Sequence, residues 1–227
     1  MGLLFVMRTD AKISIVKEMM ISMNQVLIPD KALLGSGYIT EYIDKKDSTK
    51  KHFVSEQANK FHIKLKNSFP SNLIVIGVHA KKTNYWYDNF KLFVSNVCSR
   101  KKPINVTAYY EKDGRWHAKI YFLIKNEIPI AAIIGSSNMT QPAFWDCPSY
   151  FNIEADMVIW NKTYDLEMDK IISTFPKTSI ISATMNPLWE GDCEEQRLKE
   201  LYEFINSKLP VGEISTVGAV EMNEFTL

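Results

Sequence analysis

The chain has 227 residues, 46% of them hydrophobic and 23% charged, so it can bury a sizeable core in one large domain or in one domain with an appendage. No apolar run approaches the roughly 18 residues of a membrane-spanning helix, and residues 1–7 are too short and lack the basic start of a signal peptide. We therefore expect no membrane span and no membrane partner.

Cysteine usage points to the compartment. Cys98, Cys147 and Cys193 are odd in number, scattered and without a Cys-x-x-Cys pair. This pattern argues against a zinc site or a disulfide framework and favours a reducing cytoplasm. No histidine has a partner at the spacing of metal ligands. The sequence thus predicts a cytoplasmic protein with inert thiols and no bound metal.

Charge is unevenly distributed although the net charge is only +1. Residues 186–227 hold nine Asp and Glu against three Lys and Arg, so the preceding 185 residues hold 24 basic and 17 acidic groups, a net of +7. A basic body with an acidic tail suits a polyanionic substrate.

The first predicted elements are a helix over residues 11–27 and a strand over residues 32–40. Apolar residues recur near helical spacing in the former, and Pro29 follows it. We interpret the strand as the first of the sheet. The sequence Gly35-Ser36-Gly37 inside it is a weak phosphate-loop signal, because it lacks the lysine of a P-loop.

The next segment mixes charged and apolar stretches. Residues 44–52 read as a charged loop, either solvated, which we favour, or in contact with DNA, and residues 53–65 as a helix. The continuous apolar run 72–78 is typical of a central strand buried on both faces. Lys81 and Lys82 stand among aromatic residues, a mixture that binds phosphates and stacks on bases, or that packs inward at the start of a helix.

Strands follow one another in the second half of the chain. A helix is expected over 85–97 and a strand over 104–110, and the Asp-Gly pair in the turn 111–115 is good hairpin chemistry leading into the strand after it. Later elements are strands at 128–134 and 153–160 and a helix at 164–175, capped by Asn161 or Thr163. This order predicts an α/β/α sandwich on a mixed sheet, without internal repeats.

Three polar inserts interrupt the apolar runs between Trp116 and Trp160. His117 and Lys119 are two apart, so a strand would project both from one face, with a nucleophile or general acid beside a fixed positive charge. The turn Gly135-Ser136-Ser137-Asn138 offers hydroxyl, amide and backbone donors to a phosphate oxygen. Glu154, on a third strand, could hold an imidazole in one tautomer.

The sequences His117-Ala118-Lys119 and Gly135-Ser136-Ser137-Asn138 resemble the phospholipase D superfamily signature His-x-Lys followed by Gly-Ser-x-Asn. The superfamily's usual Asp is replaced by Ile124. With Glu154 in the sequence Asn152-Ile153-Glu154, the set looks most like the metal-independent restriction endonucleases of the NgoFVII and BfiI type. The resemblance covers roughly the first three quarters of the chain.

The resemblance implies a phospholipase D-like nuclease domain over residues 1–178, followed by an acidic helical appendage or linker over 179–227. It implies a catalytic set without a metal or other cofactor: His117, Lys119, Ser136, Asn138 and Glu154. Ser137, Tyr38, Lys81 and Lys82 are candidates to bind substrate. The superfamily's chemistry needs two His-x-Lys sets, and the formal second copy, residues 62–64, stands in a helical context. One motif per chain therefore predicts a homodimer that completes the site.

The function expected from this reading is DNA hydrolysis through a covalent phosphohistidine, as the catalytic part of a restriction endonuclease that takes its specificity from a separate domain or subunit. Two alternatives remain open at this point. One is a phospholipid-cleaving or phosphatidyl-transferring enzyme with the same site, for which no membrane-surface helix is evident. The other is a catalytically degenerate module that binds nucleic acid.

Overall fold

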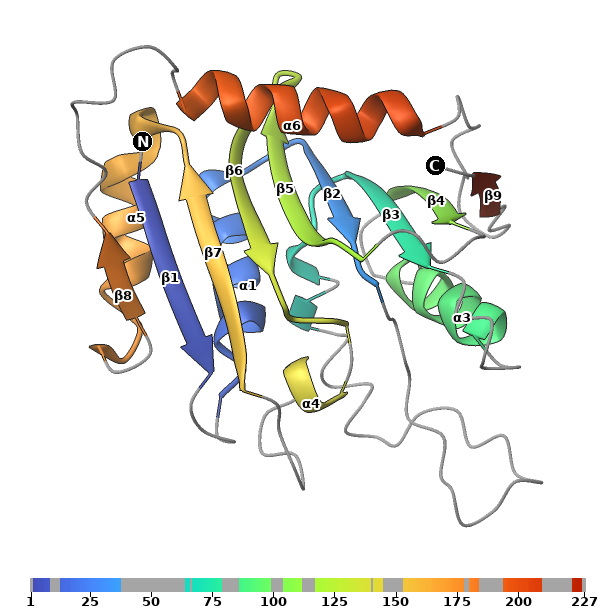
Figure 1. Ribbon diagram of the computed structural model, residues 1–227, viewed down its shortest axis with the longest axis horizontal. Helices are drawn as coiled ribbons and strands as arrows, with labels where there is room; N and C mark the ends of the chain where they lie inside the picture. Colours follow the sequence, from blue (N-terminus) through green and yellow to red (C-terminus); the bar gives the residue numbers. More distant parts are fainter. Residues whose placement is uncertain are drawn as a thin grey trace.

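The computed structural model describes residues 2–8, 13–37, 64–65, 67–78, 86–98, 104–111, 117–139, 141–144, 153–177, 180–183, 194–209 and 222–225. Within these residues the strands are β1 (Gly2–Arg8), β2 (Lys31–Gly35), β3 (Asn72–Val78), β4 (Asn105–Glu111), β5 (Lys119–Lys125), β6 (Ile128–Gly135), β7 (Glu154–Trp160), β8 (Ile180–Ala183) and β9 (Met222–Phe225). They form one sheet in the order β8-β1-β7-β6-β5-β2-β3-β4-β9 (Figure 1).

The sheet is mixed. β2, β3, β4 and β9 run parallel, whereas β5, β6, β7, β1 and β8 pair with antiparallel neighbours. The helices are α1 (Ile15–Leu27), α3 (Trp86–Cys98), the short α4 (Gln141–Phe144), α5 (Asp165–Ile172) and α6 (Glu194–Lys208). None of the described helices is long and apolar enough to cross a membrane.

Helices cover both faces, which confirms the predicted α/β/α sandwich. The larger core cluster joins one face of the sheet to α1, α3 and α5, and the smaller cluster joins the other face to α6 through Leu198, Tyr202 and Ile205. Figure 1 shows α6 lying across the sheet on the side opposite α1. Successive residues of a strand face opposite sides, so the two clusters draw on alternate positions of β5.

Helix α1 shows why the predicted helices form. Its methionines Met19, Met20 and Met23 are buried against the sheet, as the near-helical apolar spacing predicts. Asn24 accepts a hydrogen bond from the buried Tyr121 hydroxyl at 2.9 Å and donates to the Met20 carbonyl at 2.9 Å. The polar atoms on this buried face thus have partners, as burial requires.

Two sequence predictions about strand order were wrong. The strand predicted as the first is β2, because residues 2–8 form β1, in which Leu4 and Val6 are buried while Phe5 and Met7 are exposed. That alternation is the signature of a half-buried strand. The hairpin expected through residues 111–115 does not exist, because β4 pairs with β3 and β9 while β5 pairs with β2 and β6.

The helix expected over 164–175 is confirmed as α5, with a 3-10 turn (Lys162–Tyr164) before it. Asn161 caps this turn, since its side-chain oxygen accepts from the Thr163 N–H at 2.9 Å. Of the helix expected over 53–65, only Lys64 and Leu65 are described, and both are helical.

The acidic segment that follows residue 178 contributes to the same sheet. β8 pairs with β1 at one edge, β9 pairs with β4 at the other, and α6 covers the smaller core cluster. The division into a nuclease domain of residues 1–178 and an appendage of residues 179–227 stays a prediction. Because β8, β9 and α6 contact the rest of the fold, removing residues 179–227 should also change its stability.

We predict that Leu198→Ala destabilises the fold by about 2–4 kcal/mol, because it opens a cavity between α6 and the sheet. Leu198 is 3% exposed. The matched control Leu201→Ala, on the same helix at 38% exposure, should cost under about 1 kcal/mol. Urea denaturation measures both. Equal decreases in the free energy of unfolding for the two variants would mean that Leu198 is not packed between α6 and the sheet.

A chain truncated after residue 178 should lose cooperative unfolding, because Phe122, Ile76 and their neighbours in the smaller core cluster would then face water. Circular dichroism during thermal denaturation would report this. A truncated chain that unfolds cooperatively at the midpoint of the full chain would support the division at residue 178.

Candidate functional site

The polar motifs meet at the edge of the sheet that is formed by the ends of its central strands, not at an outer strand. β1, β2 and β6 end at this edge, whereas β5 and β7 begin there, as the antiparallel pairings require. The edge therefore collects Arg8, the residues after Gly35, the turn after Gly135, Lys119 and Glu154. It is the lower edge of the sheet in Figure 1, where the chain passes from β6 to α4.

Register places three residues in a row across this edge. Gly135 of β6 lies opposite Lys119 of β5 on one side and opposite Asp156 of β7 on the other. Directly paired residues share a face of the sheet. Lys119 and Asp156 therefore lie on the same face, roughly 10 Å apart at their Cα atoms, with a glycine between them. That face is the one covered by α1, because Tyr121 and Val158, two residues further along, belong to the larger cluster.

Lys119 and Asn138 border the same small space. A Cβ atom placed on Gly37, just beyond β2, would lie 3.3 Å from Lys119 Nζ and 3.4 Å from Asn138 Oδ1. Lys119 Nζ donates to the His117 carbonyl at 2.7 Å. Asn138 Oδ1 is buried and has no hydrogen-bond partner among the described residues. An ammonium and an unpaired amide oxygen thus lie next to Gly37, where a Cβ atom would be tightly packed against both.

Ser136 and Glu154 are in direct contact. The Ser136 hydroxyl donates to Glu154 Oε2 at 2.5 Å and accepts from the Ala155 N–H at 3.1 Å. Glu154 is 7% exposed and pairs in register with Arg8. Arg8 is itself buried and donates to the Ala143 carbonyl of α4 at 2.7 Å, and the buried Ser14 hydroxyl donates to that same carbonyl at 2.8 Å.

Ser137 is held by Asp156. Its backbone N–H donates to Asp156 Oδ1 at 3.2 Å and its hydroxyl donates to Asp156 Oδ2 at 2.6 Å. Burial raises the pKa of the Asp156 carboxyl, an effect that the two Ser137 hydrogen bonds oppose and the nearby Glu154 charge reinforces. Both Ser137 donors are thus engaged inside the protein. A direct contact of Ser137 with substrate remains a prediction.

His117 is exposed and lies two residues before Lys119, the first residue of β5. The position of the superfamily's missing Asp, Ile124, lies five residues beyond Lys119, roughly 17 Å away along the strand. Ile124 is fully buried in the smaller cluster, and its carbonyl accepts from the Asp30 N–H at 3.1 Å. Position 124 therefore lies at the opposite end of β5 from His117 and Lys119.

A pocket runs from this edge beneath α1. Lys119, Ser137 and Asp156 supply its polar lining, and Met20, Met139 and Phe144 are among its apolar residues. Among the described residues, no three His, Cys, Asp or Glu side chains are grouped as a metal site would require. Among the described lining residues, the titratable groups are the Lys119 ammonium and the Asp156 carboxyl, on the two sides of Gly135, and the Tyr121 phenol.

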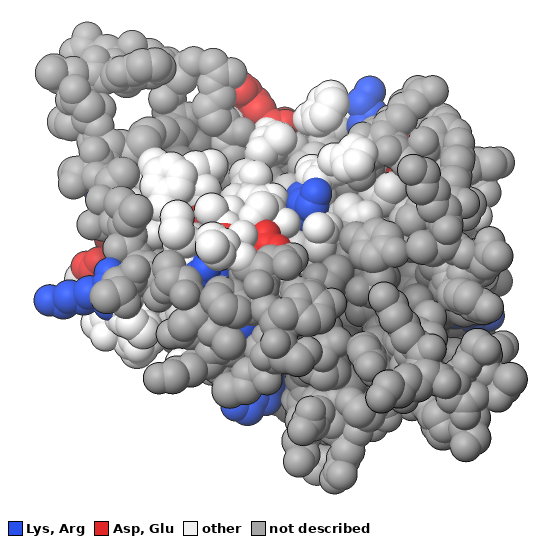
Figure 2. All heavy atoms as spheres, turned by 60° about the horizontal axis from the view of Figure 1, so that its bottom comes forward, with Lys and Arg blue, Asp and Glu red and all other residues white. Residues whose placement is uncertain are grey.

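Three predicted substrate contacts, Tyr38, Lys81 and Lys82, lie outside the described residues. The charged stretch 44–52 lies outside them as well. Figure 2 brings the lower edge of Figure 1 forward, and the described part of this face is mostly uncharged, with isolated acidic and basic side chains.

Sequence reasoning missed Arg8, Ser36, Gly37 and Asp156. The spacing Glu154-x-Asp156 could have suggested two carboxylates on one face of a strand. Ser36 and Gly37 were seen only as a weak phosphate-loop signal, and the structure brings them to the turn: Ser36 Oγ accepts from the Met139 N–H at 3.0 Å. The sequence around Arg8 gives no sign that this residue belongs to the site, because its position opposite Glu154 depends on the pairing of β1 with β7.

Comparison of the sequence with known families identifies one of them. A model of the NgoFVII restriction endonuclease N-terminal PLD (phospholipase D) domain matches residues 14–174. No curated protein matches the sequence.

Three solved structures are distantly similar. A phospholipase D family member, Nuc from Salmonella typhimurium, has a TM-score of 0.40 at 12% identity, over 81% of this chain and 98% of that one. Polyphosphate kinase from Porphyromonas gingivalis has a TM-score of 0.39 at 12% identity, over 76% and 26%. Yeast tyrosyl-DNA phosphodiesterase has a TM-score of 0.37 at 11% identity, over 70% and 46%.

The family match spans well over half of the chain and includes all three polar inserts. The chain belongs to the family of the NgoFVII restriction endonuclease N-terminal phospholipase D domain, and it is a phosphodiesterase or endonuclease of the phospholipase D superfamily.

Proposed function

We propose that this chain hydrolyses DNA without a metal, through a covalent phosphohistidine at a site that two copies of the chain complete, and that it is the catalytic part of a restriction endonuclease. The observation that carries the proposal is that Lys119 Nζ and Asn138 Oδ1 border one small space at Gly37, 3.3 Å and 3.4 Å from the position of a Cβ atom on that residue, near the exposed His117. A phosphate group needs such a cationic and amide-lined space.

The reaction would take two steps. In the first, the His117 imidazole attacks phosphorus, a P–N bond forms, and the P–O bond to the leaving sugar breaks while the second copy's imidazolium gives that oxygen a proton. In the second, water attacks phosphorus, the P–N bond breaks, and the second imidazole takes the proton of the water. Histidine suits both roles because its pKa lies near neutrality.

The remaining residues would stabilise charge and geometry. The Lys119 ammonium would donate to the non-bridging oxygens as their charge rearranges. The Asn138 amide N–H would do the same once the amide is turned over, because Oδ1 is the atom that borders the space in this structure. Ser136 and Glu154 would support this set, since the Ser136 hydroxyl donates to the buried Glu154 carboxylate. Because lysine and imidazole supply the positive charge, a metal is not needed for charge stabilisation.

The shared site follows from the single motif. The chemistry needs two histidines, whereas the described His-x-Lys set is the one at residues 117–119. The formal second copy at 62–64 ends in a helical residue, Lys64. His117 lies exposed at an edge of the molecule, where a second copy related by a two-fold axis can present its own His117.

DNA is the proposed substrate because the matching family domain is that of a restriction endonuclease. The net charge of +7 over residues 1–185 supports a polyanionic partner. Phosphate contacts carry no sequence information, so a further domain or subunit would read the sequence.

We predict that the purified chain cuts plasmid or single-stranded DNA in excess EDTA, and that His117→Ala and Lys119→Ala each lower the cleavage rate by at least about a hundredfold, since each removes a reacting or charge-stabilising group. The matched control is Lys31→Ala. Lys31 begins β2 at the other end of the sheet and pairs with exposed Glu127 at 2.7 Å, so its loss should leave the rate unchanged.

Cleavage that needs magnesium, or that survives His117→Ala, would contradict the phosphohistidine mechanism. Hydrolysis of phospholipid vesicles in place of DNA would keep the site and reject the substrate. A folded wild-type chain that binds DNA and cuts neither substrate would support the degenerate binding module.

Mixing of chains tests whether two copies share one site. After equal amounts of wild type and His117→Ala exchange subunits, we expect about one quarter of the activity of the same total amount of wild type, because only wild-type pairs hold both histidines. A complete site in each chain would leave about one half. Mixing with Lys31→Ala should leave the activity at its full value, and light scattering gives the oligomeric state.

A further inference from the structure

The orientation of Asn138 has a specific origin. Its Oδ1 is buried without a hydrogen-bond partner in the described part of the chain, so that atom does not anchor the side chain. The direction of the amide is therefore set largely by the backbone of the turn. That backbone is held on both sides of Asn138, at Ser137 and at Met139.

On the first side, the Asp156 carboxylate accepts from both donors of Ser137, at 3.2 Å from the backbone N–H and 2.6 Å from the hydroxyl. Asp156 is 4% exposed. A Cβ atom on Gly135 would lie 2.1 Å from Asp156 Oδ1 and 2.7 Å from the Ala155 carbonyl. Glycine at position 135 therefore provides the room that the carboxylate needs to reach the turn.

On the second side, the Ser36 hydroxyl accepts from the Met139 N–H at 3.0 Å. Ser36 is 1% exposed, and its own N–H donates to the Ile76 carbonyl of β3 at 3.0 Å. This support belongs to the end of β2, whereas the first belongs to β7. Two strands on opposite sides of β5 and β6 thus hold the residue between them.

We propose that Asp156 is a positioning residue for the phosphodiesterase reaction: its carboxylate fixes Ser137 and thereby aims the Asn138 amide at the space beside Lys119. Asp156 does not touch the substrate. The role of Asn138 as a contact for phosphate rests on the proposed function. The dependence of the Asn138 orientation on Asp156 does not rest on it.

Two substitutions separate geometry from charge. Asp156→Ala leaves two buried donors of Ser137 without an acceptor, which should displace the turn. Asp156→Asn has almost the same shape: its Oδ1 can accept from the Ser137 N–H, and its amide N–H can donate to the Ser137 hydroxyl, which also accepts. If Asp156 acts through geometry, the asparagine variant rescues what the alanine variant loses.

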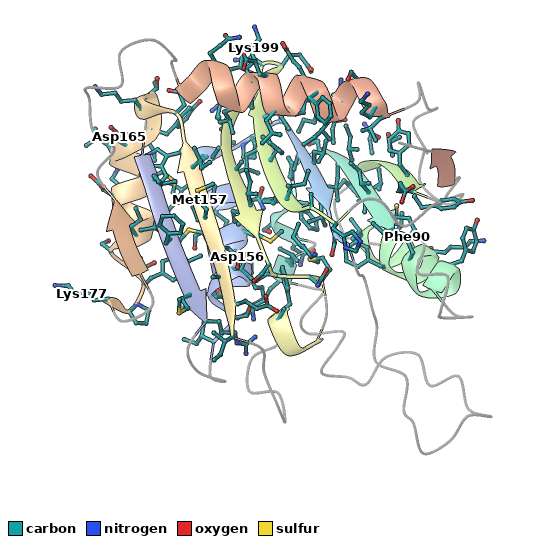
Figure 3. The ribbon with its side chains drawn as sticks, viewed as in Figure 1. Phe90, Asp156, Met157, Asp165, Lys177 and Lys199 are labelled. Carbon is teal, nitrogen blue, oxygen red and sulfur yellow. The ribbon has the colours of Figure 1, made fainter. Side chains whose placement is uncertain are left out.

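The matched control is Asp165→Ala. Asp165 also accepts a single side-chain donor, Trp160 Nε1 at 2.9 Å, near the other end of β7. Figure 3 shows Asp156 close to the β6–α4 passage and Asp165 at the opposite end of the sheet. The control thus removes another carboxylate that accepts a side-chain hydrogen bond, at the opposite end of β7, and leaves the turn untouched.

The experiment measures hydrolysis of bis(p-nitrophenyl) phosphate, a small phosphodiester, by the full chain. We expect Asp156→Ala to lower kcat about 10- to 100-fold with KM changed less than about threefold, because misplacing a charge-stabilising group acts mainly on the transition state. Asp156→Asn and Asp165→Ala should stay within about threefold of wild type. The side-chain amide resonance of Asn138 in ¹⁵N–¹H spectra should shift in Asp156→Ala alone.

An unchanged kcat in Asp156→Ala, an equal loss in Asp165→Ala, or no recovery in Asp156→Asn would overturn the proposal. A wild-type chain that hydrolyses no phosphodiester would contradict the proposed function. The Asn138 resonance would then still decide the positioning role: an unchanged resonance in Asp156→Ala rejects it, and a shift that Asp156→Asn reverses supports it.

Discussion

The pairing of β5, β6 and β7 at one edge of the sheet is the constraint on which the site depends. It sets Lys119 and Asp156 on the same face with Gly135 between them. A shift of one residue in either pairing would turn a whole strand over and move these side chains to the face of α6. The apolar residues of the same strands prevent that shift, because Tyr121 and Val158 are buried under α1 on the shared face. Core packing and site geometry thus fix the same register.

Two carboxylates are buried at this edge, and each is paired with a serine of the turn. Glu154 accepts from Ser136, and Asp156 accepts from Ser137. A buried carboxylate without a partner would cost several kcal/mol, so consecutive serines let the turn and the two carboxylates stabilise each other. The two serines follow one another in the chain, and the two carboxylates are two residues apart on β7. The doubled serine of the motif therefore has a structural explanation that a single phosphate contact would not provide.

The acidic C-terminal segment affects the charge distribution of the chain, and it is also part of the packed fold. α6 covers the smaller core cluster, and β8 and β9 pair with β1 and β4. The family match covers residues 14–174, and these elements lie beyond it. By covering the face of the sheet opposite α1, α6 buries Phe122 and Ile120 of β5. The strand that begins with Lys119 is thereby packed on both faces, which holds the start of β5 in place.

The sequence determined the local elements and the residue types of the site. Periodicity predicted α1, α3, α5 and the central strands, and the His-x-Lys and Gly-Ser-Ser-Asn motifs predicted the family, because these signals lie within short stretches of chain. Only the tertiary structure decided strand order, since the pairing of β5 with β2 and of β1 with β7 depends on residues far apart in the chain. For the same reason it alone brought Ser36 to Met139, Gly37 to Lys119 and Asp156 to Ser137. A hydrogen bond across a sheet leaves no period or spacing in the sequence, so these partners of the motif could be found only in the fold.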